Sequence, residues 1–158
     1  MSEFLDLHGR TSKLLRALVD RDVRPYGLHP GQDLVLAVLW DRDGRTPGEV
    51  AAAHHVTTPT IVKMADRLTA AGLLVRRRDP QDNRLVRLWL TDKGRGLQGA
   101  VEANRTSLEN LVTADLSEAE RQCLLTALDK IHRTATRLLE EPPTHHPEEA
   151  GRGGGNGA

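Results

Sequence analysis

The sequence predicts a mainly α-helical protein that carries one small antiparallel β-hairpin. Three observations support this fold class. Aliphatic residues recur at helical spacing over most of the 158 residues, whereas aromatic residues make up only 3% of the chain. Capping-box signals for helix starts occur where Thr46 and Ser117 are each followed three residues later by a glutamate. Two strand-like segments, 73–78 and 85–90, flank a polar run that contains a proline.

Two helices separated by a turn are predicted at the N-terminal end. Residues 3–22 carry leucines and valines with the spacing of an amphipathic helix, and Arg24–Gly27 interrupts it. We expect the next helix to start at His29-Pro30, because proline is favoured at the first helical position. Residues 34–40 are apolar almost all round, so this helix should be buried.

A helix-turn-helix pair is predicted next. Its first helix spans 47–55 and begins with the capping box of Thr46 and Glu49. Its second helix begins at Thr57 and stops at Gly72, a residue type that favours helix ends. Two short helices followed by a hairpin form a winged helix-turn-helix pattern.

The second helix of this pair has two distinct faces. At about 100° per residue, one face is small and apolar and includes Ile61, Ala65, Leu68 and Gly72. The opposite face carries Thr60, Lys63, Met64 and Arg67. Taken alone, such a face is typical of an ordinary solvated helix. Beside a basic hairpin, it indicates a surface for nucleic acid.

Positive charge is concentrated in one part of a chain whose formal net charge is zero. Residues 56–95 hold nine basic and four acidic side chains, a net charge of +5 that the rest of the chain balances. This asymmetry indicates an anionic partner. Within the hairpin, residues 85–90 alternate, so one face can pack on a core while the arginines project elsewhere.

The remaining helices come from the two ends of the chain. Thr91 opens a helix whose first turns are weakened by glycines, each costing up to about 1 kcal/mol relative to alanine. Ser117 opens a long helix with an apolar stripe that runs to about Glu141. Together with residues 3–22, these helices make a poor core, so we expect a dimer to bury them. The tail, residues 142–158, is expected to be disordered.

Composition excludes several other classes. One cysteine rules out an intramolecular disulfide, and no apolar stretch approaches the roughly 20 residues of a membrane span. With no signal peptide visible, we expect a soluble cytoplasmic protein with no membrane contact. The seven histidines form no metal motif, since His54-His55 and His145-His146 are adjacent pairs. We therefore predict no metal, no cofactor and no enzymatic activity.

The hairpin also carries a recognisable signature. It reads Asp79-Pro80-Gln81-Asp82-Asn83-Arg84, followed by Leu88-Trp89-Leu90-Thr91-Asp92-Lys93-Gly94. These residues resemble the wing of the MarR family of transcription regulators. Residues 68–77 resemble the exit of that family's recognition helix. Residues 28–32 resemble the start of its second helix, where threonine is commoner than His29. The likeness covers about residues 3–140.

The resemblance implies a homodimer that binds double-stranded DNA at a pseudo-palindromic operator. Residues 3–26 and 97–141 would form a helical dimerisation region, and residues 28–96 the winged helix-turn-helix DNA-binding domain. Matching positions on the recognition helix are Thr57, Thr58, Thr60, Lys63 and Arg67. At the wing tip Arg84 would enter the minor groove, and Asp82 would orient it or simply serve as a turn residue. Arg77 would contact phosphate or form a structural ion pair.

The same resemblance implies a ligand-responsive repressor with an effector pocket between its dimerisation helices and its DNA-binding lobe. Candidate lining residues are His8, Arg16, Tyr26 and Trp40, although a purely structural role is the favoured interpretation for each. The predicted function is a dimeric, sequence-specific DNA-binding transcription regulator, released by a small lipophilic ligand. The alternative is a winged-helix protein-interaction module without DNA binding. The basic segment favours the first hypothesis, because such a module has no need for it.

Overall fold

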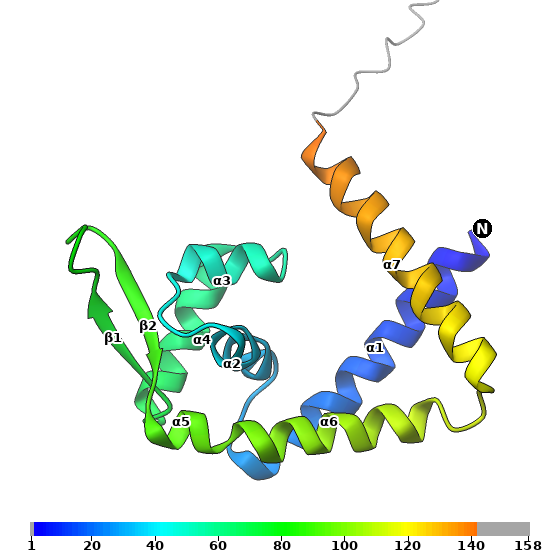
Figure 1. Cartoon of the computed structure of the whole chain (residues 1–158), viewed down its shortest axis with the longest axis horizontal. Helices are drawn as coiled ribbons and strands as arrows, with labels where there is room; N and C mark the ends of the chain where they lie inside the picture. Colours follow the sequence, from blue (N-terminus) through cyan, green and yellow to red (C-terminus); the bar gives the residue numbers. More distant parts are fainter. Residues whose placement is uncertain (1, 142–158) are drawn as a thin grey trace, which may run out of the picture. The chain divides into compact units, whose positions relative to one another are not determined.

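Helices dominate the structure, and a single hairpin provides the strands. The computed structural model describes residues 2–141, and the chain divides into two units, 1–112 and 113–158. The first unit holds α1 (Glu3–Val23), the 3₁₀ helix η1 (Arg24–Tyr26), α2 (Gln32–Asp41), α3 (Pro47–Ala53), α4 (Thr58–Ala70), β1 (Leu74–Arg78), β2 (Val86–Leu90), α5 (Asp92–Gly96) and α6 (Gln98–Val112) (Figure 1). The second unit holds α7 (Glu118–Glu140). The predicted fold class is confirmed.

Helix α2 lies at the centre of the first unit's core. Its Val35, Leu36 and Leu39 are buried completely or nearly so. The helix packs against α3, α4 and β2, which surround it. An apolar surface on all sides is what such a central position requires, and the predicted burial of this helix is confirmed.

The start of α2 differs from the prediction. The helix begins at Gln32, and Gly31 before it has a φ of 85°. This left-handed conformation suits glycine and cannot continue a right-handed helix. The His29 N–H donates to the Gln32 side-chain oxygen at 3.0 Å, which closes the turn onto the helix. Pro30 therefore lies in the turn before α2 and not at its first position.

Both predicted capping boxes are present. The Glu49 N–H donates to Thr46 Oγ1 at 3.2 Å, and the Thr46 N–H donates to Glu49 Oε2 at 2.7 Å. Ser117 and Glu120 repeat this exchange at the start of α7, with distances of 3.3 and 2.8 Å. Each box satisfies two N–H groups near a helix start that would otherwise lack partners.

The end of α4 sets the direction of the hairpin. Gly72 follows the helix with a φ of 73°. Its N–H donates to the Thr69 carbonyl at 3.0 Å, and the Leu73 N–H donates to the Leu68 carbonyl at 2.9 Å. This pair of hydrogen bonds is a Schellman motif. The chain consequently leaves α4 in a fixed direction and enters β1 at Leu74.

Strand β2 is held on both edges. It pairs antiparallel with β1, from Leu74 opposite Leu90 to Arg78 opposite Val86. On its other edge the Leu88 N–H donates to the Arg45 carbonyl at 2.8 Å and forms an isolated bridge. Leu88 and Leu90 are buried, which confirms the predicted alternation for this part of the strand, whereas Val86 on the same face is 38% exposed.

The glycine-rich segment after the hairpin divides the expected helix into α5 and α6. Thr91 caps α5, because its Oγ1 accepts the Gly94 N–H at 3.0 Å. Gly94 is buried, and a Cβ at this position would overlap the carbonyl oxygen of Leu73. The Gly94 carbonyl accepts the indole N–H of Trp40 at 3.0 Å. Helix α5 is therefore fixed against both the entry of β1 and the end of α2.

Apolar side chains remain exposed on α7 and on α1. Leu138 and Leu139 of α7 are 60% and 77% exposed, and Leu5 and Leu14 of α1 are 62% and 68% exposed. The predicted disordered tail, residues 142–158, lies outside the described residues. Within residues 2–141, no helix is long and apolar enough to span a membrane.

Candidate nucleic-acid interface

Helix α4 has an inner side that faces the core and an outer side that faces solvent. The inner side is almost fully buried and consists of Ile61, Ala65 and Leu68. The outer side is exposed and presents Thr58, Thr60, Lys63 and Arg67. The predicted division of this helix is confirmed for these residues. A cationic outer side on a firmly seated helix is a surface that can approach a charged partner as a rigid body.

Met64 does not belong to the outer side, contrary to its angular position. It is half-buried and packs against the core. Its Cε lies 2.5 Å from where a Cβ would stand at Gly31, so it fills the space beside the turn before α2. A long, flexible thioether can fold back from a nominally outward position into such a gap. Met64 therefore serves the packing of α4 on the start of α2.

Threonine hydroxyls line the first turn of α4. Thr57, the residue before the helix, and Thr60 are joined by a hydrogen bond of 2.8 Å between their hydroxyl oxygens. The Thr57 side chain makes no hydrogen bond to a backbone N–H of the helix start. Both residues are exposed, and a hydroxyl can reach either a phosphate or a base edge.

Asp79 organises the loop of the hairpin. Its Oδ1 accepts the N–H groups of Gln81 at 2.7 Å and of Asp82 at 3.0 Å, and its Oδ2 pairs with Arg87 Nε. The Asp79 N–H donates to the Leu85 carbonyl at 2.9 Å, which closes the loop. The Arg87 guanidinium and the two backbone N–H groups lower the pKa of the Asp79 carboxyl.

Arg87 connects this loop to the helices. Its Nη1 donates to the Gly44 carbonyl at 2.9 Å and lies 3.6 Å from Glu49 Oε2 of the α3 capping box. The ion pair with Asp79 raises the pKa of Arg87. Sequence reasoning placed Arg87 on the outward face and missed its partners, because Gly44 and Glu49 are far away along the chain.

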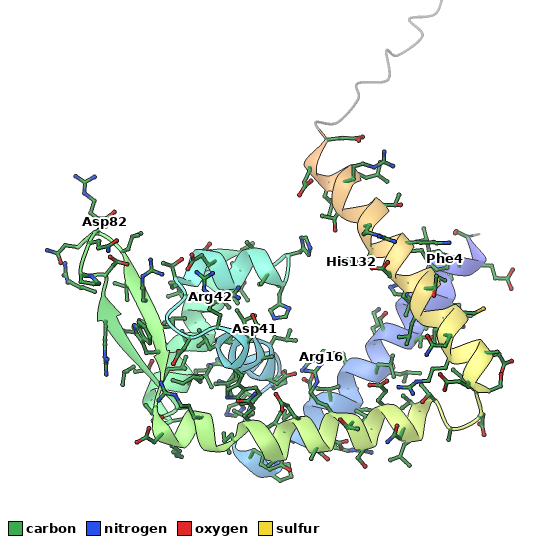
Figure 2. The ribbon with its side chains drawn as sticks, in the orientation of Figure 1. Phe4, Arg16, Asp41, Arg42, Asp82 and His132 are labelled. Atoms are coloured by element: carbon green, nitrogen blue, oxygen red, sulfur yellow. The ribbon has the colours of Figure 1, made fainter. Side chains whose placement is uncertain are left out.

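Asp82 and Arg84 occupy the end of the hairpin, where Asp82 lies away from the helices of the unit (Figure 2). Asp82 Oδ1 accepts the backbone N–H of Arg84 at 3.0 Å. This hydrogen bond stabilises the turn, which is the second of the two roles expected for Asp82 from the sequence. The Arg84 guanidinium has no hydrogen-bond or ion-pair partner among residues 2–141. That Asp82 also orients this guanidinium stays a prediction.

The nine basic side chains of residues 56–95 fall into two groups. Five bind partners within the unit: Arg76 with Asp66, Arg78 with the Asn83 carbonyl, Arg87 with Asp79, Lys93 with the Ala71 carbonyl, and Arg95 with Asp43. The other four have no partner in the described part of the chain: Lys63, Arg67, Arg77 and Arg84. All four are predicted DNA contacts. Because they lose no internal contact on binding, their charge is fully available to an anion.

Comparisons with known proteins identify the family. A family model described as "MarR family" matches residues 28–86, from the turn before α2 to the first residue of β2. The HTH-type transcriptional repressor MdtR of Bacillus subtilis (strain 168) is 30% identical over 129 residues, which cover 82% of this chain and 79% of that protein. The chain belongs to the MarR family.

Two further comparisons agree with this assignment. The HTH-type transcriptional regulator TtmR of Methylorubrum extorquens (strain PA1) is 35% identical over 108 residues, which cover 66% of this chain and 54% of that protein. The match thus spans about half the length of that relative. A solved MarR-family regulator from Listeria monocytogenes, complexed with 26mer DNA, has the same fold at 19% identity. Its TM-score is 0.77, with 85% of this chain and 89% of that chain covered.

The residues proposed for a MarR-type effector pocket each make a contact of their own. His8 stacks on Phe4, with ring centroids 5.8 Å apart. The Tyr26 hydroxyl lies 3.5 Å from the Ala100 carbonyl, and Trp40 is bonded to the backbone of α5. These contacts are structural ones, and a shared pocket around the four side chains stays a prediction.

Arg16, the fourth of these residues, belongs to an ion-pair cluster on the side of α1 that faces α2 (Figure 2). Its Nη2 lies 2.6 Å from Asp20 Oδ1 and 2.7 Å from Asp33 Oδ1. Arg105 Nη1 of α6 lies 3.6 Å from Asp33 Oδ2. Burial alone lowers the pKa of Arg16, but the pairs with Asp20 and Asp33 outweigh it, so this pKa is raised.

Proposed function

We propose that this chain is one subunit of a homodimeric, sequence-specific DNA-binding transcription regulator, a ligand-responsive repressor of the MarR type. The observation that carries the proposal is the set of four unpartnered cations, which lie on α4 and on the hairpin and nowhere else in residues 56–95. A protein-interaction module without DNA binding is the alternative. It would have no reason to keep these charges uncompensated while the neighbouring arginines are paired.

In this proposal α4 is the recognition helix and enters the major groove. Lys63 and Arg67 reach guanine or phosphate from the outer side of the helix, beside the threonine hydroxyls of its first turn. The hairpin is the wing, and Arg84 enters the adjacent minor groove, where the potential of a narrow groove is most negative. Arg77 on β1 contacts the phosphate backbone.

The proposed dimer joins two such lobes. Residues 3–26 and 97–141 form its dimerisation region, which would cover the leucines that α1 and α7 leave exposed in a single chain. A twofold dimer matches a pseudo-palindromic operator with one half-site per lobe. Support comes from the related repressor MdtR and from the DNA complex of the Listeria protein. Such a regulator acts in the cytoplasm, and a lipophilic effector would release it from DNA.

A DNA titration at several salt concentrations tests the proposal. The probe is a duplex that carries an inverted repeat from upstream of the chain's own gene, and fluorescence anisotropy reports binding. Two chains present eight unpartnered cations, so the slope of log K against log salt should approach about −7 if all of them neutralise phosphates. Absence of binding at low salt, or binding that ignores salt, would favour the interaction module.

Arg84→Ala tests the wing within the same assay. It should weaken binding by about 1–3 kcal/mol, because the lost guanidinium contacts only DNA. Lys93→Gln is the matched control, since it removes the same charge from a side chain already bonded to the Ala71 carbonyl. Equal effects of the two variants would contradict a specific role for Arg84. Circular dichroism and the oligomeric state of Arg84→Ala should match those of the wild type.

A further inference from the structure

One carboxylate in the first unit is buried beneath charges that come from other elements. Asp33 lies in the first turn of α2, and its side chain is 0% exposed. Arg16 of α1 and Arg105 of α6 face its two oxygens, and their side chains are 36% and 48% exposed. The two guanidinium groups thus cover the carboxylate from the solvent side. Asp33 Oδ2 makes no hydrogen bond in the structure.

The cluster joins two groups of helices. Helix α1 packs on α6, whereas α2 packs on α3, α4 and β2. The first group belongs to the proposed dimerisation region, and the second contains the proposed recognition helix. Asp33 is the member of the second group that both arginines of the first group approach. Its ion pairs therefore act across the boundary between the two groups.

The ion pair between Asp33 and Arg16 favours one particular arrangement of the two groups of helices. A buried carboxylate is costly unless it is paired, so the ionised Asp33 favours arrangements that keep Arg16 Nη2 within hydrogen-bonding distance. Apolar packing tolerates small sliding movements, whereas a guanidinium–carboxylate hydrogen bond weakens steeply with distance and angle. The position of Asp33 in the first turn of α2 also suits a negative charge.

We propose that Asp33 is a positioning residue for DNA binding, which sets the orientation of the DNA-binding lobe on the dimerisation helices and thereby the separation of the two α4 helices in the dimer. The inference rests on the proposed function. Asp33 touches no DNA in this arrangement. It acts through α2, against which α4 packs, and Arg16 and Arg105 hold it from the side of the dimer. The dimer consequently prefers one spacing between half-sites.

Half-site spacing provides the test. Three duplexes would carry the same inverted repeat with its natural spacing, with one base pair inserted, and with one base pair deleted. One base pair rotates the half-sites by about 34° relative to each other. Wild-type protein should bind the natural spacing best. Asp33→Asn should reduce this preference about fivefold or more, because the neutral amide no longer holds the two arginines.

Asp20→Asn is the matched control. Asp20 shares Arg16 with Asp33, but it lies on the same helix, α1, as Arg16. The control therefore removes an equal charge without cutting the link between helix groups, and it should leave the spacing preference as in the wild type. Loss of stability alone would weaken binding to all three duplexes alike and leave their ratio unchanged.

Arg105→Gln is the second variant. The Arg105 side chain is half-exposed, and Asp33 keeps its ion pair with Arg16 when the charge of Arg105 is removed. It should also relax the spacing preference, and Arg105→Lys should restore part of it. If both Asp33→Asn and Arg105→Gln keep the wild-type ratio, or if Asp33→Asn fails to fold and Arg105→Gln keeps that ratio, the inference is overturned. If the wild-type protein binds none of the three duplexes at low salt, the proposed function itself fails, and the inference fails with it.

Discussion

Replacing Gly94 by alanine should disrupt the first unit far more than a glycine-to-alanine change in a helix ordinarily does. The new Cβ would overlap the Leu73 carbonyl oxygen, and it would lie 3.3 Å from Leu90 Cδ2. That oxygen cannot simply move aside, because it accepts the Thr91 N–H at 3.0 Å. Helix α5 must therefore shift away from the entry of β1, and the bond from Trp40 to the Gly94 carbonyl must stretch.

The magnitude follows from these contacts. Overpacking a tight site costs about 1–3 kcal/mol. Weakening two hydrogen bonds adds about 1 kcal/mol for each. Better helix propensity returns up to about 1 kcal/mol. The free energy of unfolding should fall by about 2–4 kcal/mol, a large share of the roughly 5–15 kcal/mol that a domain possesses.

Urea unfolding followed by tryptophan fluorescence measures this change at fixed protein concentration. The chain has two tryptophans, Trp40 and Trp89, and both lie in the first unit. Gly99→Ala is the control, since a Cβ there has nothing within 4 Å and should stabilise α6 slightly. The reasoning is refuted if Gly94→Ala unfolds within about 0.5 kcal/mol of the wild type, or if both variants lose equal stability.

Two further predictions concern the hairpin and α7. Arg87→Met should speed hydrogen exchange of the loop around Asp79 and weaken DNA binding, because the loop loses its ion pair and its link to the helices. Mass spectrometry measures the exchange, and a rate as slow as in the wild type would contradict this prediction. Ser117 lowers the pKa of Glu120 through its backbone N–H and hydroxyl, so the stabilisation from Glu120 is present above its unfolded pKa and is lost as pH falls through the folded value. The difference in Tm between wild type and Glu120→Ala should therefore shrink from pH 7 to pH 3, and a constant difference would count against the capping box.

Local signals account for the elements that the sequence predicted correctly. Thr46 with Glu49 and Ser117 with Glu120 act over three residues, and Gly72 ends α4 through its own backbone conformation. Alternation along the second strand is likewise a property of neighbouring residues. The wing signature then tied these elements to one family, whose membership the comparisons confirm.

Distant contacts account for what the sequence did not predict. The start of α2 depends on Gly31, whose space is filled by Met64 from another helix. Periodicity assigns Met64 an angle, but it cannot tell that the side chain folds inward. The sequence alone places Arg87 among the projecting arginines and assigns no role to Asp33, because the partners of both residues lie on other elements. A single sequence gives no measure of such proximity, so the division of the arginines into paired and unpaired ones required the structure.

The outer edge of β1 influences how two copies of the chain can associate. Among the described residues β1 pairs only with β2, so its other edge exposes backbone groups that could recruit a strand from a second molecule. Three successive arginines, Arg76, Arg77 and Arg78, occupy that strand. Arg76 is paired with Asp66, but two such edges would still bring Arg77 and Arg78 of each chain together, which disfavours strand-to-strand association. This repulsion disfavours association through the hairpin and leaves the exposed leucines of α1 and α7 as the surface proposed for association between chains.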